Sequence, residues 1–392
     1  MYSRKAAFFA LLNWHEKGIF LWDSLERWKE RENPKKSDLD FAYELACGSM
    51  RMQRTLDHIV NMVCKKKPAK LKERIILRLT LYQCYFLPNI PLYAVANSSV
   101  QLAKEQCHSS FASFLNALVR KFQKRPLETD DLGIVHSFPD LFVKLLLEQY
   151  GREKTISILE SSNRPAPLMG CLYGPDFQPS DGLNVHLLDE PHPHFYIQNK
   201  TQPKLFSKLA SGLHTTPKRI LDMCAAPGGK ALMLHHTYSG AQLVVNDYAA
   251  HKIERLTENL QRFSCKPLIL CQKGEELQSD QPFDLILVDA PCSNSGVLYK
   301  CPEARWRITE EALSLLADTQ RALIANAVRL LAPNGKIWFM TCSILAQENE
   351  RQIEALCKEF HLQIDGSTYL QLPDTEGYEG GFACQLSLQP GK

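Results

Sequence analysis

From Arg219 onward the sequence alternates short apolar runs with amphipathic segments of helical length. Runs of strand length occur at residues 220–223, 243–245, 268–270, 285–288 and 337–340. Helical stretches with a 3.6-residue period lie between them, near residues 230–238, 249–263 and 310–332. This βαβ rhythm predicts an α/β, Rossmann-like domain with a doubly wound, mostly parallel sheet, which binds ligands at the carboxyl ends of its strands.

The first 125 residues show helical periodicity instead, and Pro88 and Pro91 break the chain between two segments. We expect five or six helices, one of which carries Phe41, Leu45 and Met52 on a single face, packed as a small bundle. This part has 22 Lys and Arg against 11 Asp and Glu, whereas the remainder has 24 against 32. The positive charge, including a basic loop at residues 65–70, favours contact with a polyanion; a solvated helical surface is the alternative.

These patterns divide the chain into three parts. We expect a helical domain over residues 1–127, a linker and helical segment over 128–165, and the α/β domain over 166–392. Residues 166–212 are rich in proline and give no clear assignment. Thirteen cysteines without C-x-x-C spacing, no membrane-length apolar run and no signal-peptide cleavage site predict a cytoplasmic protein without disulfides, metal or membrane contact.

Two motifs point to a nucleotide-like ligand. The first predicted strand runs into Leu-Asp-Met-Cys-Ala-Ala-Pro-Gly-Gly-Lys (221–230), where small residues let the backbone approach a ligand and the next helix presents its amide end. The string is neither a P-loop nor a dinucleotide G-x-G-x-x-G motif. Asp247 ends the second strand, where a carboxylate can accept hydrogen bonds from both ribose hydroxyls; a helix cap is the alternative.

Two later strands each end beside a cysteine. Asp-Ala-Pro-Cys (289–292) leaves the fourth apolar run, and Thr-Cys-Ser (341–343) leaves the fifth. An isolated cysteine is more often buried and structural than catalytic. The ends of parallel strands meet at one edge of a sheet, however, so both turns can share one cleft beside the nucleotide-like loop.

Residues 219–345 resemble the RsmB/Sun family of RNA cytosine-5 methyltransferases. The resemblance rests on Cys-Ala-Ala-Pro-Gly-Gly-Lys (224–230), Asp-Ala-Pro-Cys-Ser (289–293) with Gly296, and Thr-Cys-Ser (341–343). The first part resembles the NusB-like RNA-binding domain of that family, at residues 40–48, 77–83, 91–95 and 114–120. Together the resemblances cover nearly the whole chain and imply an all-α NusB-like bundle before a methyltransferase domain that uses S-adenosyl-L-methionine.

The family resemblance also implies a role for each motif residue. Cys342 would attack carbon 6 of a cytosine, Asp289 would hydrogen-bond the ring, and Cys292 would help remove the carbon 5 proton and release Cys342. In the cofactor site, Asp247 would bind the ribose hydroxyls, Glu275 the adenine, and Asp289 would border the methyl-transfer position. The remaining cofactor-binding residues implied are those of the glycine-rich loop: Cys224, Ala225, Ala226, Pro227, Gly228, Gly229 and Lys230.

The implied substrate is RNA, with small-subunit (16S) rRNA as the usual one in the family. The sequence departs from the family pattern at Glu275 and Asn199, where the family has Asp, and at residues 168–174 and 379–383. Apart from Glu275, these positions frame the RNA site and leave the target nucleotide open. Two alternatives remain: a DNA cytosine-5 methyltransferase using Cys292 as nucleophile, and an RNA-binding factor with a catalytically weakened methyltransferase fold.

Overall fold

The computed structural model describes residues 2–64, 68–165, 167–173 and 185–389. The chain forms two compact units, one of Met1–Lys144 with Cys301–Trp306, the other of Leu145–Lys300 with Arg307–Lys392. Residues 65–67 of the expected basic loop and residue 174 lie outside the described residues. Within the described ranges, no helix has the length and apolar character needed to cross a membrane.

The first unit is the expected helical bundle, and its described part up to residue 120 contains seven helices where we expected five or six. Met52 has non-helical backbone angles and separates two helices, so the prediction that it shares one helical face with Phe41 and Leu45 is wrong. The central helix buries eleven of its residues, which makes it the core of the bundle. The helices of this unit are α1 (Tyr2–Lys17), α2 (Leu21–Glu32), α3 (Lys36–Arg51), α4 (Gln53–Val63), the central α5 (Leu71–Phe86), α6 (Leu92–Gln106), α7 (Ser109–Arg120) and the short α8 (Leu132–Val135).

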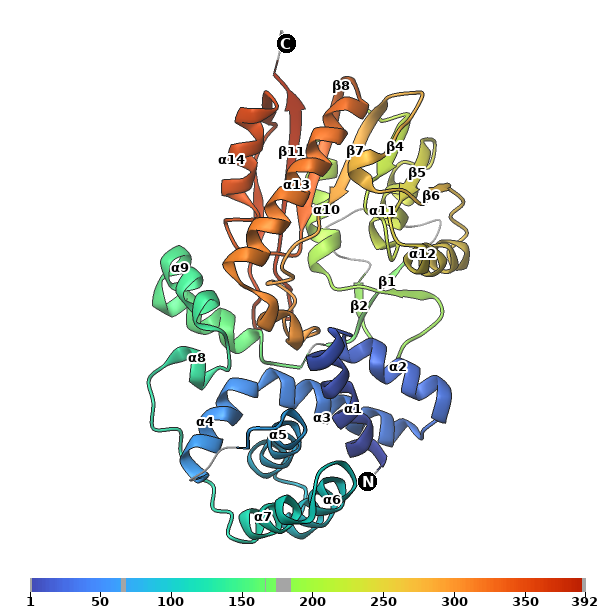
Figure 1. The fold of residues 1–392 in the computed structure, drawn as a ribbon. Coiled ribbons are helices and arrows are strands. Elements are labelled where there is room, and N and C mark those ends of the chain that lie inside the picture. The colour runs from blue at the N-terminus through green and yellow to red at the C-terminus, as the bar shows by residue number, and fades with distance from the viewer. Residues whose placement is uncertain (1, 65–67, 166, 174–184, 390–392) are drawn as a thin grey trace. The chain divides into compact units, whose positions relative to one another are not determined.

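The second unit contains an eight-stranded sheet in the order β10-β11-β8-β7-β4-β5-β6, with β9 paired to β11 (Figure 1). The strands β8, β7, β4, β5 and β6 pair in parallel, whereas β11 is antiparallel to β8, β9 and β10. This confirms the predicted Rossmann-like architecture. The bounds are β4 (Arg219–Asp222), β5 (Gln242–Asn246), β6 (Leu268–Leu270), β7 (Phe283–Asp289), β8 (Leu331–Thr341), β9 (Leu362–Ile364), β10 (Tyr369–Gln371) and β11 (Gly381–Leu388).

Helices cover both faces of the parallel strands, which explains the continuous apolar runs in the sequence. Ile220 and Trp338 pack in the cluster of one face, and their sequence neighbours Leu221 and Phe339 in the cluster of the other. The first cluster takes side chains from α10 (Thr201–Ser211), α11 (Gly229–Thr237) and α12 (Ala250–Arg262), and the second from α13 (Glu310–Leu330) and α14 (Glu350–Glu359).

The strand order reverses between β4 and β7. From β4 the chain builds β5 and β6 on one side, then returns to place β7 and β8 on the other. In open α/β sheets the carboxyl ends of the strands beside such a reversal diverge and leave a crevice for ligands. The loops after β4, β5, β7 and β8 are therefore the expected position of a functional site.

The stretch that the sequence left unassigned forms a small antiparallel sheet of order β2-β1-β3, followed by α10. Its strands are β1 (Met169–Leu172), β2 (Val185–Leu187) and β3 (Phe195–Ile197). Three or four residues are too few to show an alternating pattern. The unit also contains the larger part of α9 (Asp140–Ser161), which is interrupted at Gly151.

We expect Trp338→Ala to lower the free energy of unfolding of the second unit by about 3–5 kcal/mol, because it removes a large, fully buried side chain. The Trp338 ring meets Phe206 edge-on at 5.3 Å, and its Nε1 donates to Gln385 at 2.9 Å. Urea unfolding followed by circular dichroism measures the change. Leu315→Ala, at a side chain 65% exposed, is the control and should stay within about 0.5 kcal/mol of the parent; equal losses in the two variants would contradict this packing.

Candidate active site

The loop after β4 is shaped by one residue with left-handed backbone angles and by hydrogen bonds to β5. Gly228 has φ 114°, a conformation that favours glycine, and it immediately precedes α11. The Ala225 N–H donates to the Asn246 carbonyl at 2.8 Å, and the Asn246 side chain donates to the Met223 carbonyl at 3.0 Å. The loop is therefore fixed against β5, with the amide end of α11 directed at the carboxyl edge of the sheet.

Three aspartates lie at the ends of strands at this edge: Asp222 is the last residue of β4, Asp247 directly follows β5, and Asp289 is the last residue of β7. Asp222 is fully buried, and neither of its oxygens has a standard hydrogen bond within the described residues. Burial, together with the nearby charge of Asp289, raises the pKa of Asp222 to about 8. Asp247 is also buried, and its carboxylate accepts from the Ala226 N–H at 3.3 Å.

Lys230, from the first turn of α11, supplies a cation to this acidic edge. Its Nζ lies 2.7 Å from Oδ2 of Asp289. Burial alone would lower the pKa of Lys230, but the charge and hydrogen bond of Asp289 outweigh burial and raise it. Lys230 is thus held as an ammonium between the loop after β4 and the end of β7.

The structure brings the two strand-end cysteines into contact. The sulfur atoms of Cys292 and Cys342 lie 3.2 Å apart, and the Cys342 thiol also lies 2.9 Å from Oδ1 of Asn294. The hydrogen bond with Cys292, followed by burial, raises the pKa of Cys342 well above its ordinary value, whereas Lys230 acts in the opposite direction. In this state Cys342 is a neutral thiol at physiological pH.

A buried carboxylate that was not expected from the sequence holds the two cysteine loops together. Glu348 accepts from the Ser293 N–H at 2.7 Å, the Ser293 hydroxyl at 2.5 Å and the Ser343 hydroxyl at 2.6 Å. Ser293 and Ser343 each directly follow one of the cysteines. The only available signal was an acid five residues after Ser343, and that spacing matches no common motif. Asn294 likewise belongs to no sequence pattern that predicts its contact with Cys342.

Glu275 and Cys224, both expected to bind the cofactor, have surroundings that differ from those of the other expected residues. Glu275 lies in the short 3₁₀ turn Gly274–Glu276 after β6, where it is exposed and forms no hydrogen bond with another described residue. Cys224 is half-buried, and burial raises its pKa. The other expected residues lie along the loop after β4 or at the ends of β5, β7 and β8.

An open α/β sheet with an acid at the end of three strands, a glycine-rich turn and two touching thiols defines a Rossmann-fold transferase. Residues 213–389 match the family model described as 16S rRNA methyltransferase RsmB/F, and residues 1–124 match that of the NusB family. The chain therefore carries a NusB domain followed by an RsmB/F-type methyltransferase domain, which confirms the resemblance found in the sequence.

Curated relatives and solved structures agree with this assignment. Ribosomal RNA small subunit methyltransferase B of Vibrio cholerae is 28% identical, over 99% of this chain and 98% of its own. The protein of the same name from Shewanella oneidensis is 28% identical over 91% and 89%. The crystal structure of PH0851 shares the fold, with a TM-score of 0.80, 18% identity and 98% coverage of both chains.

We expect Gly296→Ala to displace the Cys342 loop and to lower the rate of any reaction at Cys342 by about tenfold or more, since misplacement by about 1 Å costs up to about a hundredfold. A Cβ at position 296 would lie 2.6 Å from Gly380 backbone and 2.7 Å from the Cys342 carbonyl oxygen, and backbone cannot swing aside. Single-turnover rates measure the effect. Gly240→Ala, where a Cβ meets nothing within 4 Å, is the control, and equal rates in the two variants would refute the constraint.

We expect alkylation of Cys342 by iodoacetamide to keep rising from pH 7 to pH 9, because a raised pKa leaves the thiol neutral over this range. Cys292→Ala removes the hydrogen bond that contributes most to the raised pKa. The variant should react faster at pH 8, by about tenfold for each unit by which the pKa falls. Peptide mass spectrometry measures the rate, with exposed Cys271 as an internal reference. A slower reaction of Cys342 in the variant would count against this account.

Proposed function

We propose that this protein transfers a methyl group from S-adenosyl-L-methionine to carbon 5 of a cytosine in RNA, and that small-subunit rRNA is its substrate. The observation that carries the proposal is the pair of thiols, 3.2 Å apart, at the same sheet edge as Asp289. Methylation of cytosine at carbon 5 needs one group that attacks carbon 6 and a second that removes the carbon 5 proton. Cys342 and Cys292 supply these two groups.

The residues at the strand ends fit S-adenosyl-L-methionine. The cofactor carries a sulfonium and an amino group, both cationic, and this edge holds the acidic side chains of Asp222, Asp247 and Asp289. A bound cation would lower the raised pKa of Asp222 and so favour its carboxylate form. Asp222, which lacks a standard hydrogen bond, can accept from a bound ammonium. Asp247 would accept hydrogen bonds from the ribose hydroxyls, and the glycine turn at Gly228 lets the backbone come close. When bound, the cofactor supplies the methyl group through its sulfonium.

The chain's own residues perform the remaining steps. The Cys342 thiol passes its proton to Asp289 and its sulfur bonds to carbon 6, while the electron pair of the ring double bond moves toward N3, which takes that proton from Asp289. Lys230 stays bound to Asp289 and orients its carboxyl group. After carbon 5 is methylated, the thiolate of Cys292 accepts the carbon 5 proton and the Cys342 sulfur leaves carbon 6 as a thiolate. N3 then returns its proton through Asp289 to Cys342, and the ring double bond is restored. Asn294 and Glu348 hold the two loops in register.

RNA is favoured as the substrate by the first unit and by the relatives. Residues 1–125 carry 22 basic against 11 acidic side chains, a balance that suits a phosphate backbone. The matching relatives are named ribosomal RNA small subunit methyltransferase B. The target base must leave its stack, because carbon 6 is not reachable inside a duplex.

We expect Cys342→Ala to abolish methylation while binding S-adenosyl-L-methionine as the parent does, because the thiol forms the substrate bond and holds no part of the cofactor. Cys292→Ala should form the RNA adduct but fail to release it. An rRNA transcript containing 5-fluorocytosine traps the adduct for peptide mapping, and calorimetry measures cofactor binding. Bisulfite sequencing of rRNA from a strain lacking the gene should show one lost signal. An adduct on Cys292 would favour the DNA-type mechanism, and absent cofactor binding would favour the RNA-binding factor.

A further inference from the structure

A cavity of about 390 Å³ lies in the second unit, between the small antiparallel sheet and the loop before β11. It falls within the size range of small-molecule sites, about 300–1,000 Å³. Its apolar wall comes from the segment before β1 and from β1 and β2, and includes Pro167, Met169, Val185 and Leu187. Leu187 is 74% exposed, so an apolar side chain of the lining faces solvent.

The rim of the cavity carries two cationic side chains, and among the described residues only one of them is held by neighbouring groups. Arg164 is exposed, and its guanidinium has no hydrogen bond or ion pair among the residues that the structure describes. Lys200 is held in place, because its Nζ donates to the Glu376 carbonyl at 2.8 Å and lies 3.8 Å from the centre of the Tyr378 ring. The rim therefore offers one positioned ammonium and one guanidinium available to an anion.

The acidic side chains of this lining are Asp374 and Glu376. Asp374 accepts from the N–H groups of Glu376 and Tyr378 at 3.0 Å each, and so closes the turn that forms the loop. Glu376 is exposed. A carboxylate on the rim opposes a second phosphate but can accept from the amino group of a base.

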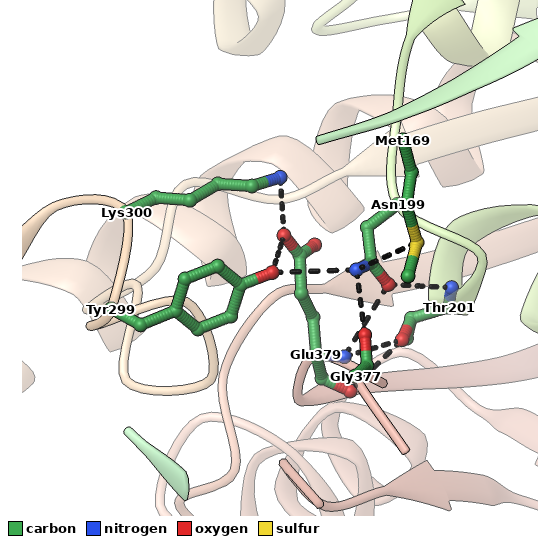
Figure 2. Close-up of polar contacts among 7 residues, drawn as sticks. All are labelled: Met169, Asn199, Thr201, Tyr299, Lys300, Gly377 and Glu379. Carbon is green, nitrogen blue, oxygen red and sulfur yellow. Dashed lines mark hydrogen bonds and ion pairs between the residues drawn. The ribbon is translucent and has the colours of Figure 1, made fainter. Parts of the chain in front are cut away.

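Tyr299 also lines the cavity and belongs to a polar cluster with Asn199, Lys300 and Glu379 (Figure 2). Its hydroxyl donates to the buried carboxylate of Glu379, and Lys300 forms an ion pair with the same carboxylate. Asn199 donates to the Tyr299 hydroxyl at 3.3 Å and to the Gly377 carbonyl at 2.9 Å. Residue 199 is an asparagine, whose amide is uncharged. The charged groups of the cluster are therefore the carboxylate of Glu379 and the ammonium of Lys300.

Backbone hydrogen bonds continue this cluster to Cys342. The residue after Glu379 is Gly380, whose N–H donates to the Gly296 carbonyl at 2.8 Å, and the Gly296 N–H donates to the Cys342 carbonyl at 2.9 Å. Thr201 fixes Glu379 from the other side, since its hydroxyl accepts from the Glu379 N–H at 2.8 Å. The cavity wall and the cysteine loop are therefore parts of one continuous framework.

We propose that this cavity binds one unpaired nucleotide of the RNA that adjoins the methylated cytosine. The base packs on the apolar wall near Leu187, and Arg164 binds its phosphate. A base that leaves its stack for methylation exposes its neighbour, and single-stranded RNA is recognised through such splayed bases and their phosphates. This inference rests on the proposed function, because it assigns a second contact to the same RNA.

Two single substitutions on the rim test the nucleotide site with an unmodified small-subunit rRNA transcript. Arg164→Ala should raise KM for the transcript by about threefold to tenfold with kcat unchanged, and should reduce the slope of log binding constant against log salt by about 0.7, as expected for one lost phosphate contact on single-stranded RNA. Leu187→Glu should raise KM by about tenfold, as expected for one lost base contact, while Leu187→Met keeps it near the parent value. Arg329→Ala is the matched control, because Arg329 is an exposed arginine in the last turn of α13, just before β8 begins, and does not line this cavity.

Crosslinking locates the contact independently of the substitutions. A transcript carrying 4-thiouridine should crosslink to peptides containing residues 167–169, 185–187 or 374–378, and Arg164→Ala should weaken those crosslinks. If the parent methylates the transcript but both substitutions leave KM and the salt slope unchanged, the nucleotide site is refuted and the proposed function stands. If the parent neither methylates the transcript nor forms the adduct with its 5-fluorocytosine form, the proposed function itself fails. Crosslinks confined to other peptides would also overturn the nucleotide site.

Discussion

The parallel pairing of β7 with β8 is the constraint on which the active site depends. Asp289 pairs with Met340 in this register, so the chain leaves both strands at the same level of the sheet. Cys292 follows three residues after Asp289 and Cys342 two residues after Met340. A shift by one residue would turn the side chains of a strand to the opposite faces and separate the two sulfur atoms. Buried layers on both faces oppose such a shift.

The sequence allowed the central sheet and most of its strand-end residues to be predicted, and the physical reason is burial. The strands β4, β5, β7 and β8 are covered by helices on both faces, so they appear as apolar runs even without structural information. The functional residues then follow from topology, because parallel strands deliver their carboxyl ends to one edge. For this reason the sequence alone predicts that Cys292 and Cys342 can share one cleft, although 50 residues separate them.

The parts that escaped prediction are those whose structure depends on distant partners. The strands β1 to β3 have three or four residues each and exist through pairing with one another. Met52 interrupts what reads as one amphipathic helix. Glu348 is an unremarkable acid in the sequence, and its importance arises only when folding places Ser293 and Ser343 around its carboxylate. Hydrogen bonds between side chains that are far apart in the sequence produce no periodic pattern in the local sequence.

In the proposed mechanism, the charges around Cys342 explain how its thiol stays neutral without substrate and ionises during the reaction. The hydrogen bond with Cys292, burial and the charge of Asp289 disfavour the Cys342 thiolate and raise its pKa, whereas the charge of Lys230 favours the thiolate. The carboxylate of Asp289 is already bound to Lys230, so the field of that cation on the sulfur is partly cancelled. A cytosine whose amino group donates a hydrogen bond to Asp289 would offset part of this negative charge and leave Lys230 less compensated. Arrival of the base would thereby lower the pKa of Cys342 and activate the nucleophile only when its substrate is present.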